Sequence, residues 1–199
     1  MPHPPILIPE IGRGREKEAS KTLSGLENLT SSVKNLRPDV LLVLSPHQPY
    51  AYDSLYVNNA ENFSGSFAMF GVPSVKIDAV SSSKDTEKLC AFLENSGTKI
   101  FSRPFEILTE DQGSLVPLYF LRKVWGNLPP LIIASTIGLT PAEAFKMGRA
   151  LAKFDAGKKF ALLASGDLSH RMTPDAPAGY EPEYAPIFEK AIEDALDRK

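Results

Sequence analysis

The stretch DVLLVLSPH, residues 39–47, constrains the fold of this chain more than any other part of the sequence. Five consecutive aliphatic residues, Val40 to Leu44, lie between Pro38 and Pro46 and predict a short strand buried on both faces. Such strands are typical of parallel sheets that are covered on both sides. His47 follows directly, and open α/β sheets bind ligands at the C-terminal ends of their strands. The sequence therefore puts a titratable, metal-competent side chain where a ligand is expected.

Other apolar or alternating segments predict further strands of the same sheet, at residues 75–79, 131–135 and 160–164. Residues 55–57 predict an edge strand. We expect residues 1–14 to form a shaped loop, because their prolines and glycines forbid a regular helix. Residues 58–71 are expected to form a covering loop, and residues 100–112 a connection.

Helical patterns alternate with these strands. Apolar residues three or four positions apart predict helices at residues 16–36, 83–95, 113–125, 140–154 and 184–199. Thr140-Pro-Ala-Glu143 is a capping box, and Pro117 is tolerable only in the first turn of its helix. The alternation predicts an α/β fold, a three-layer α/β/α sandwich with a mostly parallel central sheet, as a single domain over residues 1–199.

Composition argues against several function classes. A formal net charge of −2, with basic residues scattered along the chain, gives no electrostatic footprint for nucleic acid. No apolar run approaches the ~18–20 residues of a membrane span. The amino terminus lacks a signal-peptide layout, so we expect a cytoplasmic protein. Cys90, the single cysteine, lies in an apolar helical pattern and is expected to be a buried, unreactive thiol.

The chain has three histidines, His3, His47 and His170, and each lies in a loop rich in proline or glycine. A lone loop histidine is usually bonded only to nearby backbone, but His47 and His170 both follow strands expected to be neighbours. If His3 and His47 meet at the sheet edge, they supply two imidazole ligands. One carboxylate would complete the facial set suited to Fe(II), and His170 could act as general base.

Other candidates remain open from the residues alone. Asp167 could orient His170 or merely cap its loop. Glu110 and Asp111 could be a catalytic pair, although acidic residues before a helix usually complement its dipole. A hydrolase would rest only on Ser45 and Ser169, of which Ser169 lacks the sequence context of a nucleophile.

Four motifs, taken together and in this order, resemble the class III extradiol ring-cleavage dioxygenase catalytic-subunit (LigB-like) superfamily: MPHPPILIPEIGRG, LSPHQPY, EDQGSLVPLYFL and ASGDLSHRMTPDAPAGY. The likeness is strongest to its Memo-related members of the AmmeMemoRadiSam system. The resemblance implies nonheme Fe(II), or another divalent metal, on His3 and His47, with His170 as the acid–base residue. It also implies a catechol-type aromatic substrate, O2, and a homo-oligomer or partner protein.

The sequence departs from the family pattern in two places. Gln112 stands where relatives commonly have a histidine that helps to handle protons, and an amide cannot change charge near neutral pH. We include Gln112 with His170 in the candidate catalytic set. The family's glutamate ligand has no matching motif here, which leaves several carboxylates open: Glu181, Glu183, Glu189 and Glu193. We therefore expect a family member shortened at both ends.

Two functions follow from this resemblance. The first is an Fe(II)-dependent extradiol dioxygenase that opens a catechol-type ring with O2. The second is a catalytically impaired, Memo-like protein that uses the same pocket for metal or ligand binding in a partner assembly.

Overall fold

The computed structural model describes residues 1–176 and 178–197. The chain divides into two compact units, Met1–Ser165 and Gly166–Lys199, which are described separately. The expectation of one domain over the whole chain stays a prediction.

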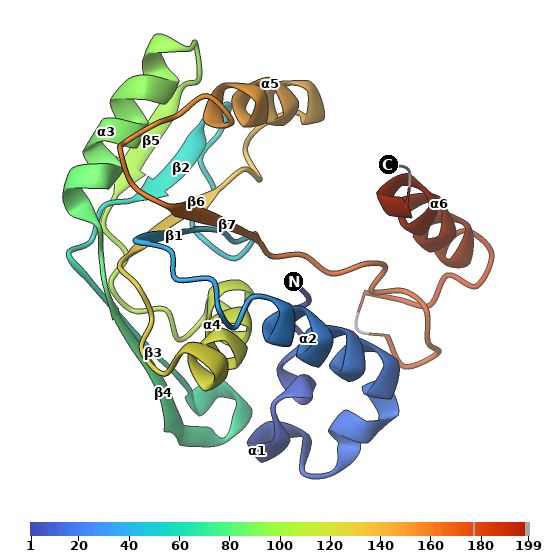
Figure 1. The fold of residues 1–199 in the computed structure, drawn as a ribbon. Coiled ribbons are helices and arrows are strands. Elements are labelled where there is room, and N and C mark those ends of the chain that lie inside the picture. The colour runs from blue at the N-terminus through green and yellow to red at the C-terminus, as the bar shows by residue number, and fades with distance from the viewer. Residues whose placement is uncertain (177, 198–199) are drawn as a thin grey trace. The chain divides into compact units, whose positions relative to one another are not determined.

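A five-stranded sheet in the order β5-β2-β6-β1-β7 forms the centre of the first unit (Figure 1). Its strands are β1 (Val40–Leu44), β2 (Leu55–Asn58), β5 (Ile100–Arg103), β6 (Leu131–Ser135) and β7 (Phe160–Ala164). β1 is parallel to both β6 and β7, and β2 is parallel to β5 but antiparallel to β6. Parallel neighbours align their C-terminal ends, so residues that follow β1, β6 and β7 lie at one edge.

Two apolar cores cover the two faces of this sheet. Leu41 and Val43 of β1 belong to the core that includes α2 (Ser20–Ser32) and α4 (Gln112–Trp125). Val40 and Leu42 point to the opposite face and pack with α3 (Ser83–Asn95) and α5 (Pro141–Leu151). Successive side chains of a strand alternate between faces, so a fully apolar β1 serves both cores. The predicted α/β/α sandwich with a mostly parallel sheet is confirmed.

A separate antiparallel hairpin, β3 (Asn62–Phe67) and β4 (Val72–Val80), stands apart from the central sheet. The short turn η3 (Ala68–Phe70) connects its strands. Residue Gly65 of β3 lets the hairpin approach α4, because a Cβ there would lie 2.7 Å from Cδ2 of Leu115.

Several sequence-based predictions are wrong in this region. The predicted covering loop at 58–71 contains β3, and the predicted strand at 75–79 belongs to the hairpin rather than to the central sheet. The predicted edge strand at 55–57 is internal, and the connection at 100–112 contains the edge strand β5. Alternation shows that a segment is extended, but not which strand it pairs with.

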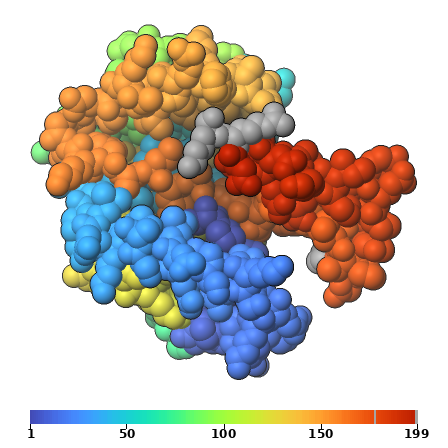
Figure 2. Space-filling view, turned by 45° about the vertical axis from the view of Figure 1, so that its right-hand side comes forward, coloured from blue at the N-terminus to red at the C-terminus, as the bar shows by residue number. Residues whose placement is uncertain are grey.

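The N-terminal segment lies at the surface of the first unit, shown in blue in Figure 2. Two short helical turns, η1 (Pro5–Leu7) and α1 (Pro9–Gly12), lie within residues 1–14, where a shaped loop was expected. A third turn, η2 (Arg15–Ala19), occupies the start of the helix predicted over residues 16–36. Pro5 and Pro9 begin their turns, where the missing N–H costs nothing because it would have no helical partner.

The observed starts of α5 and α4 can be compared with the starts predicted from the sequence. The capping box of α5 is confirmed, since Glu143 N donates to Thr140 Oγ1 at 3.3 Å and Thr140 N donates to Glu143 Oε2 at 2.8 Å. The position of Pro117 was predicted wrongly. It lies beyond the first turn of α4, because that helix already begins at Gln112 and is capped by Asp111.

The second unit contains α6 (Ala185–Asp197), close to the helix predicted there. Two hydrogen bonds join Arg171 to residues later in the segment before this helix. Arg171 Nε donates to the carbonyl of Ala178 at 2.9 Å, and Glu181 N donates to the carbonyl of Arg171 at 3.0 Å. Among the described residues, no helix has both the length and the apolar character needed to cross a membrane.

Candidate functional site

His3 and His47 meet at the C-terminal edge of the sheet. Their Nε2 atoms are 3.2 Å apart, and their rings are nearly perpendicular, with centroids 4.9 Å apart. The His3 side chain is buried and that of His47 is partly exposed. The structure thus brings together the two imidazoles that sequence reasoning expected to meet.

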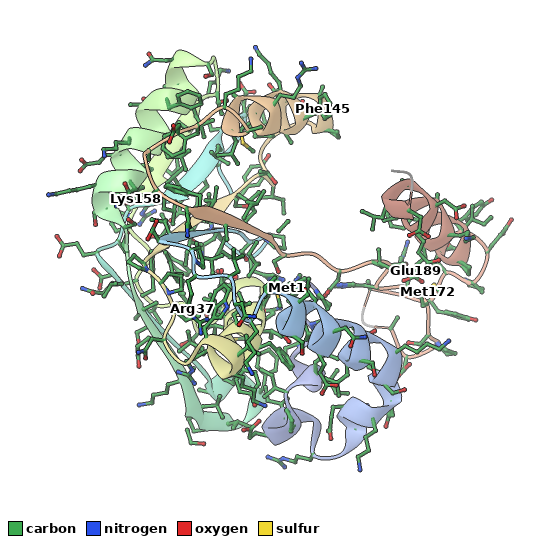
Figure 3. All side chains as sticks on the ribbon, viewed as in Figure 1. Met1, Arg37, Phe145, Lys158, Met172 and Glu189 are labelled. Atoms are coloured by element: carbon green, nitrogen blue, oxygen red, sulfur yellow. The ribbon has the colours of Figure 1, made fainter. Side chains whose placement is uncertain are left out.

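The tip of β7 holds His3 in place. Ser165 is the first residue after β7, and its Oγ lies 3.0 Å from Nδ1 of His3. The backbone nitrogen of Met1, labelled in Figure 3, donates to the carbonyl of Ala164 at 2.5 Å. Because Nδ1 is occupied by Ser165, the ring presents Nε2 toward His47.

His47 is held by the turn after β1 and by the start of α4. Its backbone N–H donates to Ser45 Oγ at 3.2 Å. A Cβ on Gly113 would lie 2.9 Å from Cδ2 of His47 and closer still to Ser45 Oγ. Gly113 therefore provides the space in which the His47 ring rests against the helix backbone.

A buried carboxylate lies beneath this turn. Asp111 is fully buried, and its Oδ1 accepts hydrogen bonds from Ser45 Oγ at 2.5 Å and from Ser114 N at 2.9 Å. Its Oδ2 accepts a hydrogen bond from Gln48 Nε2 at 2.5 Å. The sequence indicated only that an acidic residue before this helix would complement the helix dipole, and the side-chain cap is seen in the structure. The link to the turn that carries His47 was missed, since no local pattern joins positions 45, 48 and 111.

Gln112 and His170 are the other two residues that the sequence predicts to be catalytic. Gln112 is the first residue of α4 and is partly buried, one position before Gly113. His170 belongs to the second unit, where its Nε2 lies 3.3 Å from Oδ2 of Asp167. That contact matches the alternative in which Asp167 orients His170. The catalytic roles of Gln112 and His170 stay predictions.

The histidine pair fits two ligands of one metal ion. Two imidazole nitrogens bound at about 2.0–2.1 Å to one ion lie roughly 2.8–3.4 Å apart for bond angles of about 90–109°. The 3.2 Å between the Nε2 atoms falls in that range. The same spacing also allows one ring nitrogen to donate a hydrogen bond to the other. Within residues 1–176 and 178–197, no group of three metal-binding side chains converges, so the pair supplies two donors.

The whole chain, residues 1–199, matches the family described as the catalytic LigB subunit of aromatic ring-opening dioxygenase. The chain belongs to this family. The resemblance found in the sequence motifs is confirmed at this level, while the Memo-related subtype stays a prediction.

Two curated proteins illustrate the relationship. Protein CA_C1420 of Clostridium acetobutylicum is 28% identical over 191 residues, which cover 92% of this chain and 41% of that protein. The 2-aminophenol 1,6-dioxygenase beta subunit of a Pseudomonas species is 27% identical over 193 residues, covering 85% of this chain and 60% of that protein. The chain thus spans less than two thirds of the length of either relative.

Proposed function

We propose that this LigB family chain carries the metal-binding part of an extradiol ring-cleavage dioxygenase that acts on a catechol-type aromatic with O2. The observation that carries this proposal is the 3.2 Å approach of the two Nε2 atoms. Nonheme Fe(II) suits such a site, because a 2-His-1-carboxylate set leaves coordination positions open. Another divalent metal with imidazole affinity would fit the same pair.

In this proposal His3 and His47 hold the metal through Nε2, and Ser165 keeps His3 turned toward it. When bound, Fe(II) supplies open positions for substrate oxygens and O2, together with the redox chemistry of ring opening. The carboxylate ligand would come from a residue that the described structure does not bring to the pair.

The proton chemistry is assigned to His170. We propose that its imidazole accepts a proton from a hydroxyl of the substrate, with Asp167 orienting the ring. Gln112, at the start of α4, can donate and accept hydrogen bonds but cannot carry a proton away. Gln112 would then position substrate or water, and His170 alone would act as acid and base.

A second candidate function is a Memo-like protein that binds metal or ligand in this pocket without opening a ring. The amide at Gln112 favours it, because that position offers no titratable group. The 27% identical relative is named as a beta subunit. We therefore propose a partner subunit or a homo-oligomer for either function, and a cytoplasmic location.

An anaerobic assay separates the two functions. The purified protein is loaded with Fe(II) without oxygen, mixed with catechols, and then exposed to air. A yellow ring-opened product that disappears in His47→Ala supports the dioxygenase. The matched control is Phe145→Ala, an exposed residue of α5 that should keep full turnover. Metal binding without product across a broad catechol panel would instead support the second function.

A further inference from the structure

The buried residues around Asp111 form a chain of hydrogen bonds with a fixed direction. Its anchor is Asn58, at the end of β2. The Oδ1 of Asn58 accepts from the backbone N–H groups of Ala60 at 3.1 Å and Phe105 at 3.0 Å, while its Nδ2 donates to the carbonyl of Phe105 at 2.8 Å. Backbone groups cannot exchange donor and acceptor roles, so the Asn58 amide cannot flip.

The fixed amide of Asn58 sets the orientation of Gln48. Asn58 Nδ2 donates to Gln48 Oε1 at 3.0 Å, which leaves Nε2 of Gln48 to face Asp111. Position 111 therefore meets a donor at Oδ2, from Gln48, and two donors at Oδ1, from Ser45 and from the backbone of Ser114. Only a carboxylate accepts at both oxygens, because an asparagine would place an NH2 group against one of these donors.

The last link reaches His47. The Ser45 hydroxyl donates its hydrogen bond to Asp111, so its oxygen lone pairs remain to accept a hydrogen bond from the backbone N–H of His47. Asn58, Gln48, Asp111 and Ser45 are each less than 5% exposed, so water cannot replace these bonds without opening the structure. Asn58 of β2 thus holds Gln48 directly. The carboxylate of Asp111 joins Gln48 to Ser45, and it joins both of them to the start of α4.

We infer that Asp111 is a positioning residue, which must be a carboxylate in order to hold the turn between Ser45 and Gln48 in the conformation that directs His47 toward His3. The inference rests on the proposed function only for the use made of the histidine pair. Residues that orient metal-binding histidines from behind typically change metal affinity ~10–100-fold when they are mutated.

The fixed direction of these hydrogen bonds predicts that two substitutions, each harmful alone, compensate for each other when combined. Asp111→Asn sets an NH2 group against a donor, and Gln48→Glu sets two carboxylates against each other. Each single variant should weaken the turn. In the double variant, a glutamate at position 48 accepts hydrogen bonds from the amides of Asn58 and of the asparagine at position 111. The side-chain oxygen of that asparagine still accepts hydrogen bonds from Ser45 Oγ and Ser114 N. The double variant therefore restores a donor for every acceptor.

The test uses the full chain and two readouts that do not involve turnover. The first is the affinity for Co2+, followed by its absorption spectrum, and the second is hydrogen-exchange protection of the His47 amide. We expect Asp111→Asn and Gln48→Glu each to lower Co2+ affinity ~10-fold or more and to reduce protection of that amide. The double variant should recover most of both. The control is Asp78→Asn, an exposed carboxylate that accepts a hydrogen bond from Ser64 and should change neither readout.

Ser45→Ala keeps the inference testable if Asp111→Asn does not fold, because it removes the hydroxyl that joins Asp111 to the His47 N–H. The carboxylate keeps its bonds from Gln48 and Ser114. Loss of His47 amide protection in Ser45→Ala supports the inference. Wild-type values in folded single variants, or a folded double variant as impaired as the singles, would overturn it. If the wild-type protein binds no Co2+, the proposed metal function fails, while amide protection still decides the role of Asp111.

Discussion

The Nε2 atoms of His3 and His47 face each other at 3.2 Å although the two residues are 44 positions apart in the chain. His3 is held by Ser165 at the tip of β7, and His47 by the turn after β1. Since β1 and β7 are parallel neighbours, their adjacent tips bring the two histidines together. The pair is thus a product of sheet topology, as expected of a ligand site in an open α/β sheet.

Gly113→Ala should disrupt the pair without harming its helix. The new methyl group would lie 2.9 Å from Cδ2 of His47 and closer still to Ser45 Oγ, so the turn and the ring that it carries must move. We expect Co2+ affinity to fall at least ~10-fold, while the helical circular dichroism signal is retained. The matched control is Gly148→Ala in α5, where a Cβ meets no atom within 4 Å and alanine should stabilise the protein by about 0.5–1 kcal/mol. Unchanged affinity in Gly113→Ala would show that His47 does not need its position against α4.

Ser165→Ala should loosen His3. The substitution removes the partner of Nδ1 at 3.0 Å, so the ring gains freedom to rotate and Nε2 faces His47 for less of the time. We expect Co2+ affinity to fall ~10-fold with little change in thermal stability. Competition with a chromophoric chelator measures this change, and Ser32→Ala, an exposed serine at the end of α2, serves as the control. Equal affinity of the Ser165→Ala variant and the wild type would contradict a positioning role for Ser165.

The sequence predicted the parts of the fold that depend on local pattern. β1 and β6 are aliphatic runs, and the capping box of α5 combines Thr140 and Glu143 at the required spacing. The strands β2, β3, β4 and β5 were assigned wrongly, and β2 and β5 are the shortest of them. These two have four residues each, and β2 pairs in opposite senses with its two neighbours, which no property of so short a segment indicates.

The candidate site was predictable to a similar degree. His3 and His47 were identified because each lies in a loop rich in proline or glycine, because His47 follows a buried strand, and because their motifs resemble those of the family. The role of Asp111 could be predicted only in part, as an acidic residue that complements the dipole of the helix after it. Its other bonds reach Ser45 and Gln48, more than 60 residues away in the chain, and a single sequence holds no signal for such a buried network.

Cys90 should react slowly with thiol reagents in the native protein. Burial, with a smaller contribution from the nearby Glu94 carboxylate, raises the pKa of the Cys90 thiol to about 11. Only the thiolate attacks a disulfide reagent, so little reactive form exists at pH 8. We expect the rate of labelling by dithiobis-nitrobenzoate to rise steadily between pH 8 and about 11. Protein unfolded in urea should label rapidly with a midpoint near ~8.5, and fast native labelling at pH 8 would contradict the prediction.

Asp85 should make the stability of the first unit depend on pH. Its side chain, at the start of α3, is almost fully buried, and Lys158, labelled in Figure 3, donates to its Oδ2 at 2.6 Å. Burial alone would raise the pKa of Asp85, but hydrogen bonds from Lys158 and Ser82 and the charge of Lys158 outweigh it, so the pKa is lowered. A carboxyl whose folded pKa is depressed stabilises the fold above its unfolded pKa of ~3.9. This contribution is lost as the pH falls through the folded pKa.

Asp85→Asn tests this pH dependence. At pH 7 the variant should be less stable by roughly 1–3 kcal/mol, toward the lower end because Lys158 is partly exposed and its charge is screened. Below pH ~4 the difference from the wild type should begin to shrink, because the carboxyl of the unfolded chain takes up a proton there while the native carboxyl, whose pKa is lowered, still keeps its charge beside Lys158. Melting temperatures measured from pH 7 to pH 3 give the comparison, with Asp78→Asn as the control for an exposed carboxylate. A difference that stays constant over this range would mean that Asp85 acts through its shape and hydrogen bonds rather than through its charge.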